Sequence, residues 1–285
     1  MSAYTELLAD LEAEYQSLLA LLRPLDEAAW DLATPAEGWA VRDQISHLAY
    51  FDDAAREAVT DGDAFLVFVA DAIEKGGDPM EEHLVRGRAI SGSAVLAWFE
   101  QAHEGLSGAL DGLDPSARVP WFGPAMGVMS FVSARLMETW AHGQDVADAL
   151  GAERTPTARL RHIAHLGVRA RPYSYVVRGL DVPAGRIDVV LVGPDGDEWS
   201  WVVGEDGGSG DGGDGGDGGG AGGAAGGGGA ASVRGNALEF GLVVTQRRNV
   251  DDTSLEVTGG LAVEWLQIAQ AFAGPAGPGR AATGS

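Results

Sequence analysis

The stretch METWAHGQD, residues 137–145, lies in the middle of a helix that we expect from about Val128 to Leu150. Glu138 and His142 are four residues apart, so on a helix they share one face and their Cβ atoms are neighbours. Asp145 follows a further turn along. A carboxylate and an imidazole in this arrangement can bind one metal ion, but the same spacing is common on solvated helix surfaces. The pair alone leaves both interpretations open.

Three other segments of the first half are also amphipathic. The first predicts a helix that ends at Pro24, because its apolar residues recur at spacings of three and four: Leu7, Leu8, Leu11, Tyr15, Leu18, Leu19 and Leu22. The second helix is expected at about Val41–Thr60 and the third at Gly92–Leu110, with shorter helices at 64–74 and 157–167. Four long amphipathic helices predict a four-helix bundle, which builds its sites from side chains on facing helices.

The pattern changes after about Pro183. RIDVVLVG and EWSWVVG are β-branched and aromatic runs joined by PDGD, which predicts a β-hairpin. Further along, GNALEFGLVVTQRRN is compatible with a helix, SLEVTG with a strand and LAVEWLQIAQAFAG with a final helix. The segment between them, residues 204–232, is so rich in glycine that it could not form a packed core, and we expect a flexible insertion.

The expected fold class is therefore α+β. We expect a metal-binding helical bundle at residues 1–155 and a small α+β domain at 156–274 that contains the glycine-rich insertion. A disordered tail is expected at 275–285.

Composition limits the classes of function. The 285-residue chain is 45% apolar, enough for a sizeable core, and its formal net charge is −23. That charge would repel nucleic acid and anionic membranes. The absence of cysteine excludes disulfides, cysteine-ligated zinc and a thiol nucleophile of the protein's own. No signal peptide or apolar run of about 20 residues is visible, so we expect a cytoplasmic protein, either a monomer or a homodimer.

His47, in the segment WAVRDQISHL, is the best candidate for a third metal ligand. Two histidines and one glutamate form the open three-ligand arrangement of catalytic zinc sites, which leaves positions for water or substrate. The same set matches the facial triad that binds ferrous iron. A lone histidine on such a helix is more often a packed core residue than a ligand, and the sequence does not settle the metal.

The other histidines are weaker candidates. His162 and His165 have arginines beside them, which disfavours a divalent ion, so we expect them at a surface. His103 falls in the apolar stripe of the third helix and is expected to contribute packing. His83 follows two glutamates in a segment that we expect to be a loop, and nothing in the sequence supports a ligand role for it.

Two motifs carry a resemblance to a known family. Trp-x-Val-Arg-Asp-x-x-x-His-Leu at 39–48, followed by Glu-x-x-x-His-x-x-Asp at 138–145, resembles the DinB-like superfamily. More narrowly, residues 5–150 resemble the N-terminal metal-binding domain of mycothiol-dependent maleylpyruvate isomerase. Residues 243–274 are similar to the tail of actinobacterial proteins that combine this domain with a region resembling a wyosine-base-formation domain.

The resemblance implies zinc bound by His47, Glu138 and His142, with Fe²⁺ or Ni²⁺ as alternatives. It also implies an enzyme that activates a low-molecular-weight thiol, such as mycothiol, for isomerisation of a small electrophile or for transfer of sulfur to it. Asp43 and Asp145 are the candidates for orienting ligands or moving protons.

Arg247 and Arg248 are the candidates for holding a carboxylate of the substrate or cofactor through bidentate hydrogen bonds. Alternatively, they cap the helix before the turn at Asn249. Two other functions stay open. One is a metal-dependent hydrolase, in which the ion lowers the pKa of a bound water. The other is a non-catalytic module that binds a metal or a ligand.

Overall fold

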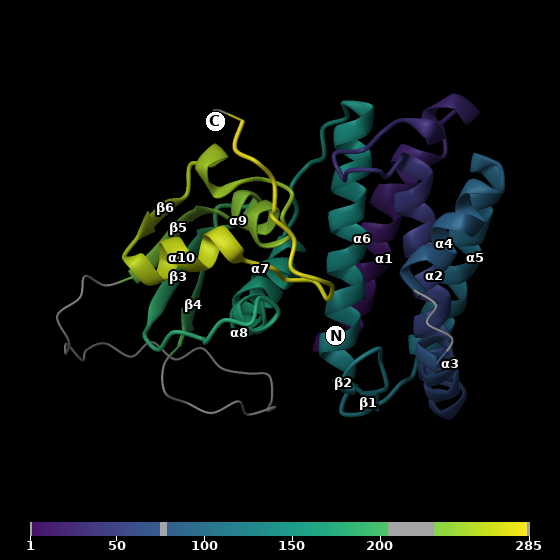
Figure 1. The fold of residues 1–285 in the computed structure, drawn as a ribbon, viewed down its shortest axis with the longest axis horizontal. Coiled ribbons are helices and arrows are strands. Elements are labelled where there is room, and N and C mark those ends of the chain that lie inside the picture. The colour runs from purple at the N-terminus through teal and green to yellow at the C-terminus, as the bar shows by residue number, and fades with distance from the viewer. Residues whose placement is uncertain (1, 75–78, 205–230, 284–285) are drawn as a thin grey trace. The chain divides into compact units, whose positions relative to one another are not determined.

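The computed structural model describes residues 2–74, 79–204 and 231–283. The chain divides into two compact units, Met1–Thr155 and Pro156–Ser285. We call them the helical unit and the mixed unit and describe each by itself (Figure 1). Helices dominate the first, and the second combines helices with a four-stranded sheet, which confirms the α+β class.

Four long helices form the core of the helical unit: α1 (Ala3–Leu22), α2 (Val41–Thr60), α5 (Gly92–Leu110) and α6 (Val128–Leu150). Helix α2 packs against α5 and α6, and α1 packs against α6 and α5, so the predicted four-helix bundle is confirmed (Figure 1). The buried residues are mostly those of the predicted apolar stripes, including Leu18 and Leu22 of α1, Ile45 and Leu48 of α2 and Phe99 of α5.

Local sequence signals explain where these helices begin and end. Ser2 Oγ accepts a hydrogen bond from the backbone N–H of Thr5, and Ser91 Oγ accepts one from Ala94, so each serine caps the start of a helix. Helix α6 ends at Gly151, whose φ of 63° lies in the left-handed region that glycine adopts without strain.

Shorter elements complete the helical unit: the 3₁₀ helix η1 (Glu27–Asp31), α3 (Gly62–Glu74), α4 (Pro79–Arg88) and the paired strands β1 (Arg118–Val119) and β2 (Met126–Gly127). Helix α4 corrects the sequence analysis, which expected a loop around His83. It packs against α2 and thereby brings new side chains to the middle of the bundle. Among the described residues, no helix is long and apolar enough to cross a bilayer.

The mixed unit contains a sheet with strand order β4-β3-β5-β6. Its strands are β3 (Ile187–Val192), β4 (Glu198–Val203), β5 (Ala231–Asn236) and β6 (Glu256–Thr258). The predicted β3–β4 hairpin is confirmed, whereas β5, which pairs parallel to β3, was not predicted. The sequence analysis had extended the glycine-rich insertion to residue 232, but β5 already begins at Ala231. Residues 205–230, the rest of that insertion, lie outside the described residues.

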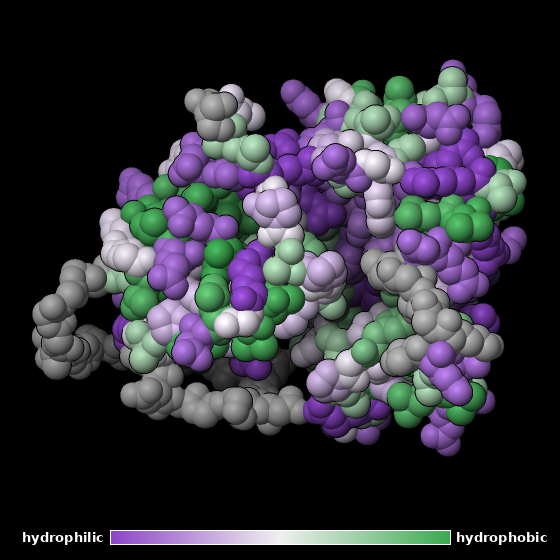
Figure 2. Space-filling model, in the orientation of Figure 1, coloured by the Kyte–Doolittle hydropathy of each residue, from purple (hydrophilic) through white to green (hydrophobic). Residues whose placement is uncertain are grey.

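The described part of the mixed unit contains the α-helices α7 (Leu160–Arg169), α8 (Arg171–Val176), α9 (Ala237–Val244) and α10 (Gly260–Ile268) and the 3₁₀ helix η2 (Val250–Asp252). Phe240 of α9 and Trp265 of α10 are fully buried and meet edge to face in the core of this unit. Residues 275–283, for which the sequence predicts disorder, form no helix or strand. They hydrogen-bond to the rest of the unit, for instance where the Asn249 side chain donates to the Arg280 carbonyl. Hydrophilic and hydrophobic side chains are interspersed on the visible face of each unit (Figure 2).

Candidate metal centre

Helices α2 and α6 bring His47, Glu138 and His142 together inside the bundle. One potential ligand atom from each residue lies within 4.8 Å of the others. Oε2 of Glu138 is 3.2 Å from Nε2 of His142 and 3.9 Å from Nε2 of His47. Both histidines are buried and Glu138 is half-buried. The structure therefore places together the three residues that the sequence analysis selected, while their role as ligands stays a prediction.

The spacing and chemistry of these atoms fit a divalent ion. Ligand atoms about 2.1 Å from a shared ion lie about 3.4 Å apart at a tetrahedral angle. The separations of 3.2 and 3.9 Å fall on either side of that value. Two imidazole nitrogens and one carboxylate oxygen are a donor set that zinc and ferrous iron both accept. Among the described residues, this is the one group of three or more potential ligands that converges in this way.

The protonation of His47 and Glu138 also suits metal binding. Burial and the neighbouring His142 lower the pKa of His47 to about 3, so its imidazole is neutral at physiological pH. Burial by itself would raise the pKa of Glu138, but hydrogen bonds and charge interactions with His142 and His47 hold it well below its usual range. An ionised carboxylate and a neutral imidazole are the forms that ligate metals.

Aromatic rings cover the imidazoles. The half-buried indole of Trp39 is 5.4 Å from His47 and is stacked on His142 at 5.9 Å, measured between ring centroids. The ring of Phe51 lies 4.6 Å from that of His47. Trp39 also lines an open groove of about 640 Å³, together with Thr34 and other residues of the loop before α2, Asp43 of α2 and Arg88 of α4. Trp39 therefore contacts both candidate imidazole ligands and also lines a groove of small-molecule size.

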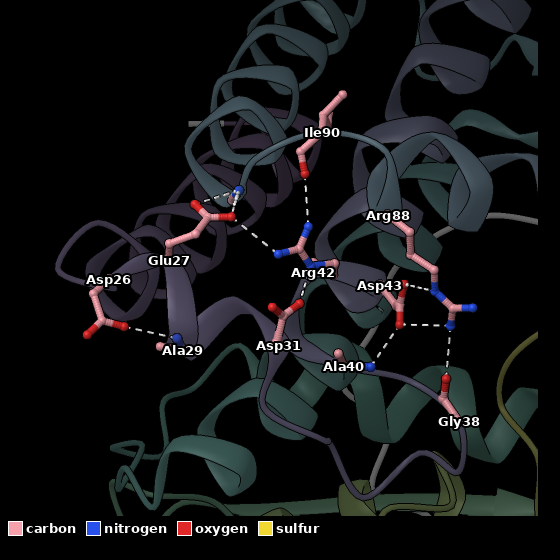
Figure 3. Close-up of polar contacts among 11 residues, drawn as sticks. Asp26, Glu27, Ala29, Asp31, Gly38, Ala40, Arg42, Asp43, Arg88 and Ile90 are labelled. Carbon is pink, nitrogen blue, oxygen red and sulfur yellow. Dashed lines mark hydrogen bonds and ion pairs between the residues drawn. The ribbon is translucent and has the colours of Figure 1, made fainter.

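The contacts of the Asp43 carboxylate stabilise the local fold. Its carboxylate accepts hydrogen bonds from Arg88 Nε at 2.9 Å and Nη2 at 3.0 Å, and from the backbone N–H of Ala40 at 2.9 Å (Figure 3). These contacts cap the start of α2 and tie α4 to it. They give no support to the proton-transfer role that the sequence analysis considered for Asp43. Nearby, Arg42 binds Glu27, Asp31 and the carbonyl of Ile90, so it too serves to hold this corner of the bundle together (Figure 3).

Asp145 is buried one turn after His142 on α6. This position is compatible with the expected outer-shell or substrate-side role, which stays a prediction.

Arg247 and Arg248 lie in the mixed unit, just after α9. Nη1 of Arg247 donates to the Thr245 carbonyl and Nη1 of Arg248 donates to the Arg247 carbonyl, both at 2.7 Å. These contacts favour the alternative considered from the sequence, in which the arginines cap the helix. Their role in binding a carboxylate stays a prediction.

His83 was missed as a residue of this region. It lies on α4, fully buried, with its ring centroid 5.0 Å from that of His47 and 5.4 Å from that of Trp39. A signal for the helix was present in the sequence. Pro79 stands at its start, acidic residues fill its first turn and arginines its last turn, which is the usual asymmetry of a helix.

The remaining histidines lie outside this centre. His165 is exposed, as expected, and accepts a hydrogen bond from Trp201. His103 is buried, as its position in the apolar stripe predicts, but it also belongs to a charged network. Its Nε2 is 2.9 Å from Oε2 of Glu12, and its ring stacks on Tyr15 at 3.5 Å.

Comparisons with known proteins connect the helical unit to a described family. Residues 11–147 match the family model described as the mycothiol maleylpyruvate isomerase N-terminal domain. Two uncharacterized proteins, from two strains of Mycobacterium tuberculosis, are each 40% identical over 272 residues, which is 95% of this chain and 97% of theirs.

The fold is also similar to solved structures. The crystal structure of the mycothiol-dependent maleylpyruvate isomerase matches with a TM-score of 0.56 at 16% identity, over 92% of this chain and 94% of that one. A single-residue mutant of that enzyme matches at 17% identity with the same TM-score. At this level of identity the likeness shows that the fold is shared.

Proposed function

Residues 11–147 belong to the family of the mycothiol maleylpyruvate isomerase N-terminal domain, and from this premise we propose that the chain is a metal-dependent enzyme that uses a low-molecular-weight thiol. The proposed reaction is the isomerisation of a small electrophile or the transfer of sulfur to it. The observation that carries the proposal is the convergence of His47, Glu138 and His142 within 4.8 Å of one another.

In this proposal His47, Glu138 and His142 hold the metal ion, with zinc as the first candidate and ferrous iron or nickel as alternatives. A bound divalent ion favours the thiolate form of a thiol at neutral pH. The chain has no cysteine, so the thiol has to be a cosubstrate, and family membership points to mycothiol or a similar compound.

The protein's own side chains prepare this site. Glu138 supplies the negative charge, and His47 supplies a neutral imidazole because its burial disfavours the protonated form. Trp39 and Phe51 cover the imidazoles and limit the access of water, which strengthens electrostatic interactions inside the site. Asp145, one turn beyond His142, remains the candidate for an outer-shell group. The net charge of −23 disfavours a polyanionic substrate and agrees with a small one.

A turnover assay tests the proposal. The zinc-loaded protein is incubated with maleylpyruvate, and with a series of other small electrophiles, in the presence and absence of mycothiol. We expect turnover that requires both thiol and metal and that is lost in His142→Ala. His165→Ala serves as the matched control, because it removes an exposed histidine of the mixed unit and should leave turnover unchanged.

Two other outcomes would replace the proposal. Turnover that does not depend on thiol would identify a hydrolase. Metal binding without turnover, combined with a cobalt-substituted spectrum that no thiol perturbs, would identify a non-catalytic binding module.

A further inference from the structure

Gln44 of α2 connects the loop before that helix to His142 of α6. Nδ1 of His142 lies 2.5 Å from Oε1 of Gln44. Nε2 of Gln44 donates to Oγ1 of Thr34 at 2.8 Å, and Oγ1 of Thr34 donates to the carbonyl oxygen of Trp39 at 2.9 Å. Gln44 is fully buried and Thr34 is 9% exposed, so water competes little for these bonds.

The last acceptor in this series of hydrogen bonds, the carbonyl oxygen of Trp39, determines which group donates in each of them. A carbonyl oxygen can only accept, so the single hydroxyl proton of Thr34 is used on Trp39. The Thr34 oxygen must then accept from Gln44, which has to present its NH₂ group there and its carbonyl oxygen to His142. Nδ1 of His142 must therefore carry a proton.

The anchor of the chain is itself held in place. The backbone N–H of Thr34 donates to the same Trp39 carbonyl at 2.8 Å, and Ala33 forms an isolated β-bridge with Ala40. The loop that carries Thr34 is closed by backbone bonds, so the hydroxyl group has little freedom to turn away.

We propose that Thr34 and Gln44 form a positioning relay that sets the tautomer and ring orientation of His142, with the proton on Nδ1 and the metal-binding lone pair on Nε2. The role of that lone pair rests on the proposed function, whereas the tautomer follows from the hydrogen bonds. Thr34 and Gln44 are positioning residues, because they act through His142.

The opposite side of the His142 ring supports this assignment. Nε2 faces Oε2 of Glu138 at 3.2 Å. When Nδ1 holds the proton of a neutral ring, Nε2 and the carboxylate are both acceptors, and two acceptors lie this close in a buried site only if a proton or a metal ion accompanies them. The relay thus makes the Glu138 side of the ring the side that binds a cation.

The two candidate histidine ligands differ in this respect. Nδ1 of His47 is buried without a hydrogen-bond partner among the residues that the structure describes, and its ring is held by contacts with Trp39 and Phe51. A hydrogen bond to the second ring nitrogen fixes the tautomer of a ligating histidine and raises its basicity. His142 is therefore the ligand that is oriented before the ion arrives.

Nitrogen NMR of the metal-free protein tests the relay without reference to activity. At about pH 8, above the ordinary histidine pKa of about 6.5, two-bond ¹H–¹⁵N correlations distinguish the two neutral tautomers. His142→Ala identifies the signal of interest among the six histidines. We expect Nδ1 of His142 to carry a proton in the wild-type protein, either in the neutral Nδ1–H tautomer or in the imidazolium whose second proton faces Glu138, and finding the neutral Nε2–H tautomer would overturn the proposal.

Two pairs of variants sharpen this test. Gln44→Leu removes the acceptor, and Thr34→Val frees the Gln44 amide to turn its NH₂ group towards His142, so both should populate the Nε2–H tautomer. Gln44→Glu retains an acceptor and Thr34→Ser retains the hydroxyl, so both should keep the wild-type tautomer. Melting temperatures of the metal-free variants identify any that fail to fold, and the two conservative variants keep the test decisive in that case.

Zinc affinity gives the second readout. Removing the hydrogen-bond partner of a metal-binding histidine weakens metal affinity by about 10- to 100-fold, which we expect for Gln44→Leu, with a smaller loss for Thr34→Val. Gln44→Glu and Thr34→Ser should bind zinc like the wild type. Wild-type affinity in Gln44→Leu would reject the relay while leaving the metal site intact. If the wild-type protein bound no metal, the proposed function would fail, and the tautomer measurement would still decide whether the relay exists.

Discussion

Two buried histidine clusters lie in the same bundle, and the pKa values of His47 in one and His103 in the other are shifted in opposite directions. In the candidate metal centre, burial and the nearby His142 lower the pKa of His47 to about 3. In the second cluster, burial alone would lower the pKa of His103, but hydrogen bonds and charge interactions with Asp52 and Glu12 raise it. Burial and His142 favour the neutral form of His47, whereas Asp52 and Glu12 favour the protonated form of His103.

The ratio of carboxylates to imidazoles explains the difference. His47 and His142 share one carboxylate, that of Glu138. His103 has two carboxylates close by, at 2.9 Å from Glu12 and 3.8 Å from Asp52. A buried imidazole with a carboxylate on each side is stabilised as a cation, while two imidazoles that share one carboxylate favour a divalent ion. We therefore interpret the second cluster as a structural network of ion pairs, which also includes Arg135.

The largest effect should come from breaking that network. Arg135 binds Asp52 at 2.8 Å, and both side chains are buried. Arg135→Met leaves the buried carboxylate of Asp52 without the positive charge of the arginine. Removing one partner of such a buried pair costs about 3–5 kcal/mol of folding stability. Urea denaturation of the metal-free protein measures this loss.

An exposed ion pair is the matched control for that change. Arg23→Gln removes the exposed pair with Glu100 and should cost no more than about 1 kcal/mol. Equal losses in the two variants would show that the buried network has no special role.

The second-largest effect should come from zinc, which should stabilise the protein through the candidate metal centre and not through the His103 cluster. An ion that binds only the folded state at 100 times its dissociation constant stabilises it by about 2.7 kcal/mol, so zinc should raise the melting temperature of the wild type. His47→Ala should lose this increase. His103→Gln, with a lower starting stability, should retain it, and loss of the zinc effect in His103→Gln would contradict the separation of the clusters.

The pH dependence of stability should give a smaller signal that is specific to the second cluster. The folded-state pKa of His103 is raised above its unfolded value, so its contribution is fully present below the unfolded pKa and is lost as the pH rises through the folded pKa. The charged and titratable groups around it are Glu12, Asp52, Arg135 and Tyr15. Denaturation curves of the metal-free protein from neutral to alkaline pH should show a decline that His103→Gln lacks. Identical slopes in the two proteins would remove His103 as its cause.

The smallest expected effect tests whether Asp43 belongs to the metal centre. Asp43→Asn weakens the contact with Arg88 and the cap of α2, which should cost about 1 kcal/mol of stability. Thiol-dependent turnover should stay within a few-fold of the wild-type rate if Asp43 is structural. A loss of about 100-fold or more would instead support the proton-transfer role considered from the sequence.

The parts of the fold that depend on local patterns could be predicted from the sequence. Helices α2, α5 and α6 follow from apolar residues at spacings of three and four, which depend only on near neighbours in the chain. Strand β5, although as long as β3 and β4, was missed because it contains Gly235 and is held by parallel pairing with β3, a partner distant in the sequence.

The same distinction applies to the candidate site. The spacing of Glu138 and His142 is visible locally, whereas His47 could be named from the residues only as the best candidate, because its addition depends on how α2 packs against α6; the family motif then selected the same residue. Gln44 carries no signal of its own, because its role depends on a hydroxyl in the preceding loop and an imidazole on another helix. His103 looked like a packing residue because its carboxylate partners, Glu12 and Asp52, come from other helices.

Metal analysis by mass spectrometry, on protein purified without a histidine tag, tests the central claim most directly. We expect about one divalent ion bound to each wild-type chain and almost none in His47→Ala or His142→Ala, with the wild-type content retained in His103→Gln. A wild-type chain that stays free of metal after incubation with zinc, or ligand variants that retain it, would contradict the account of this centre.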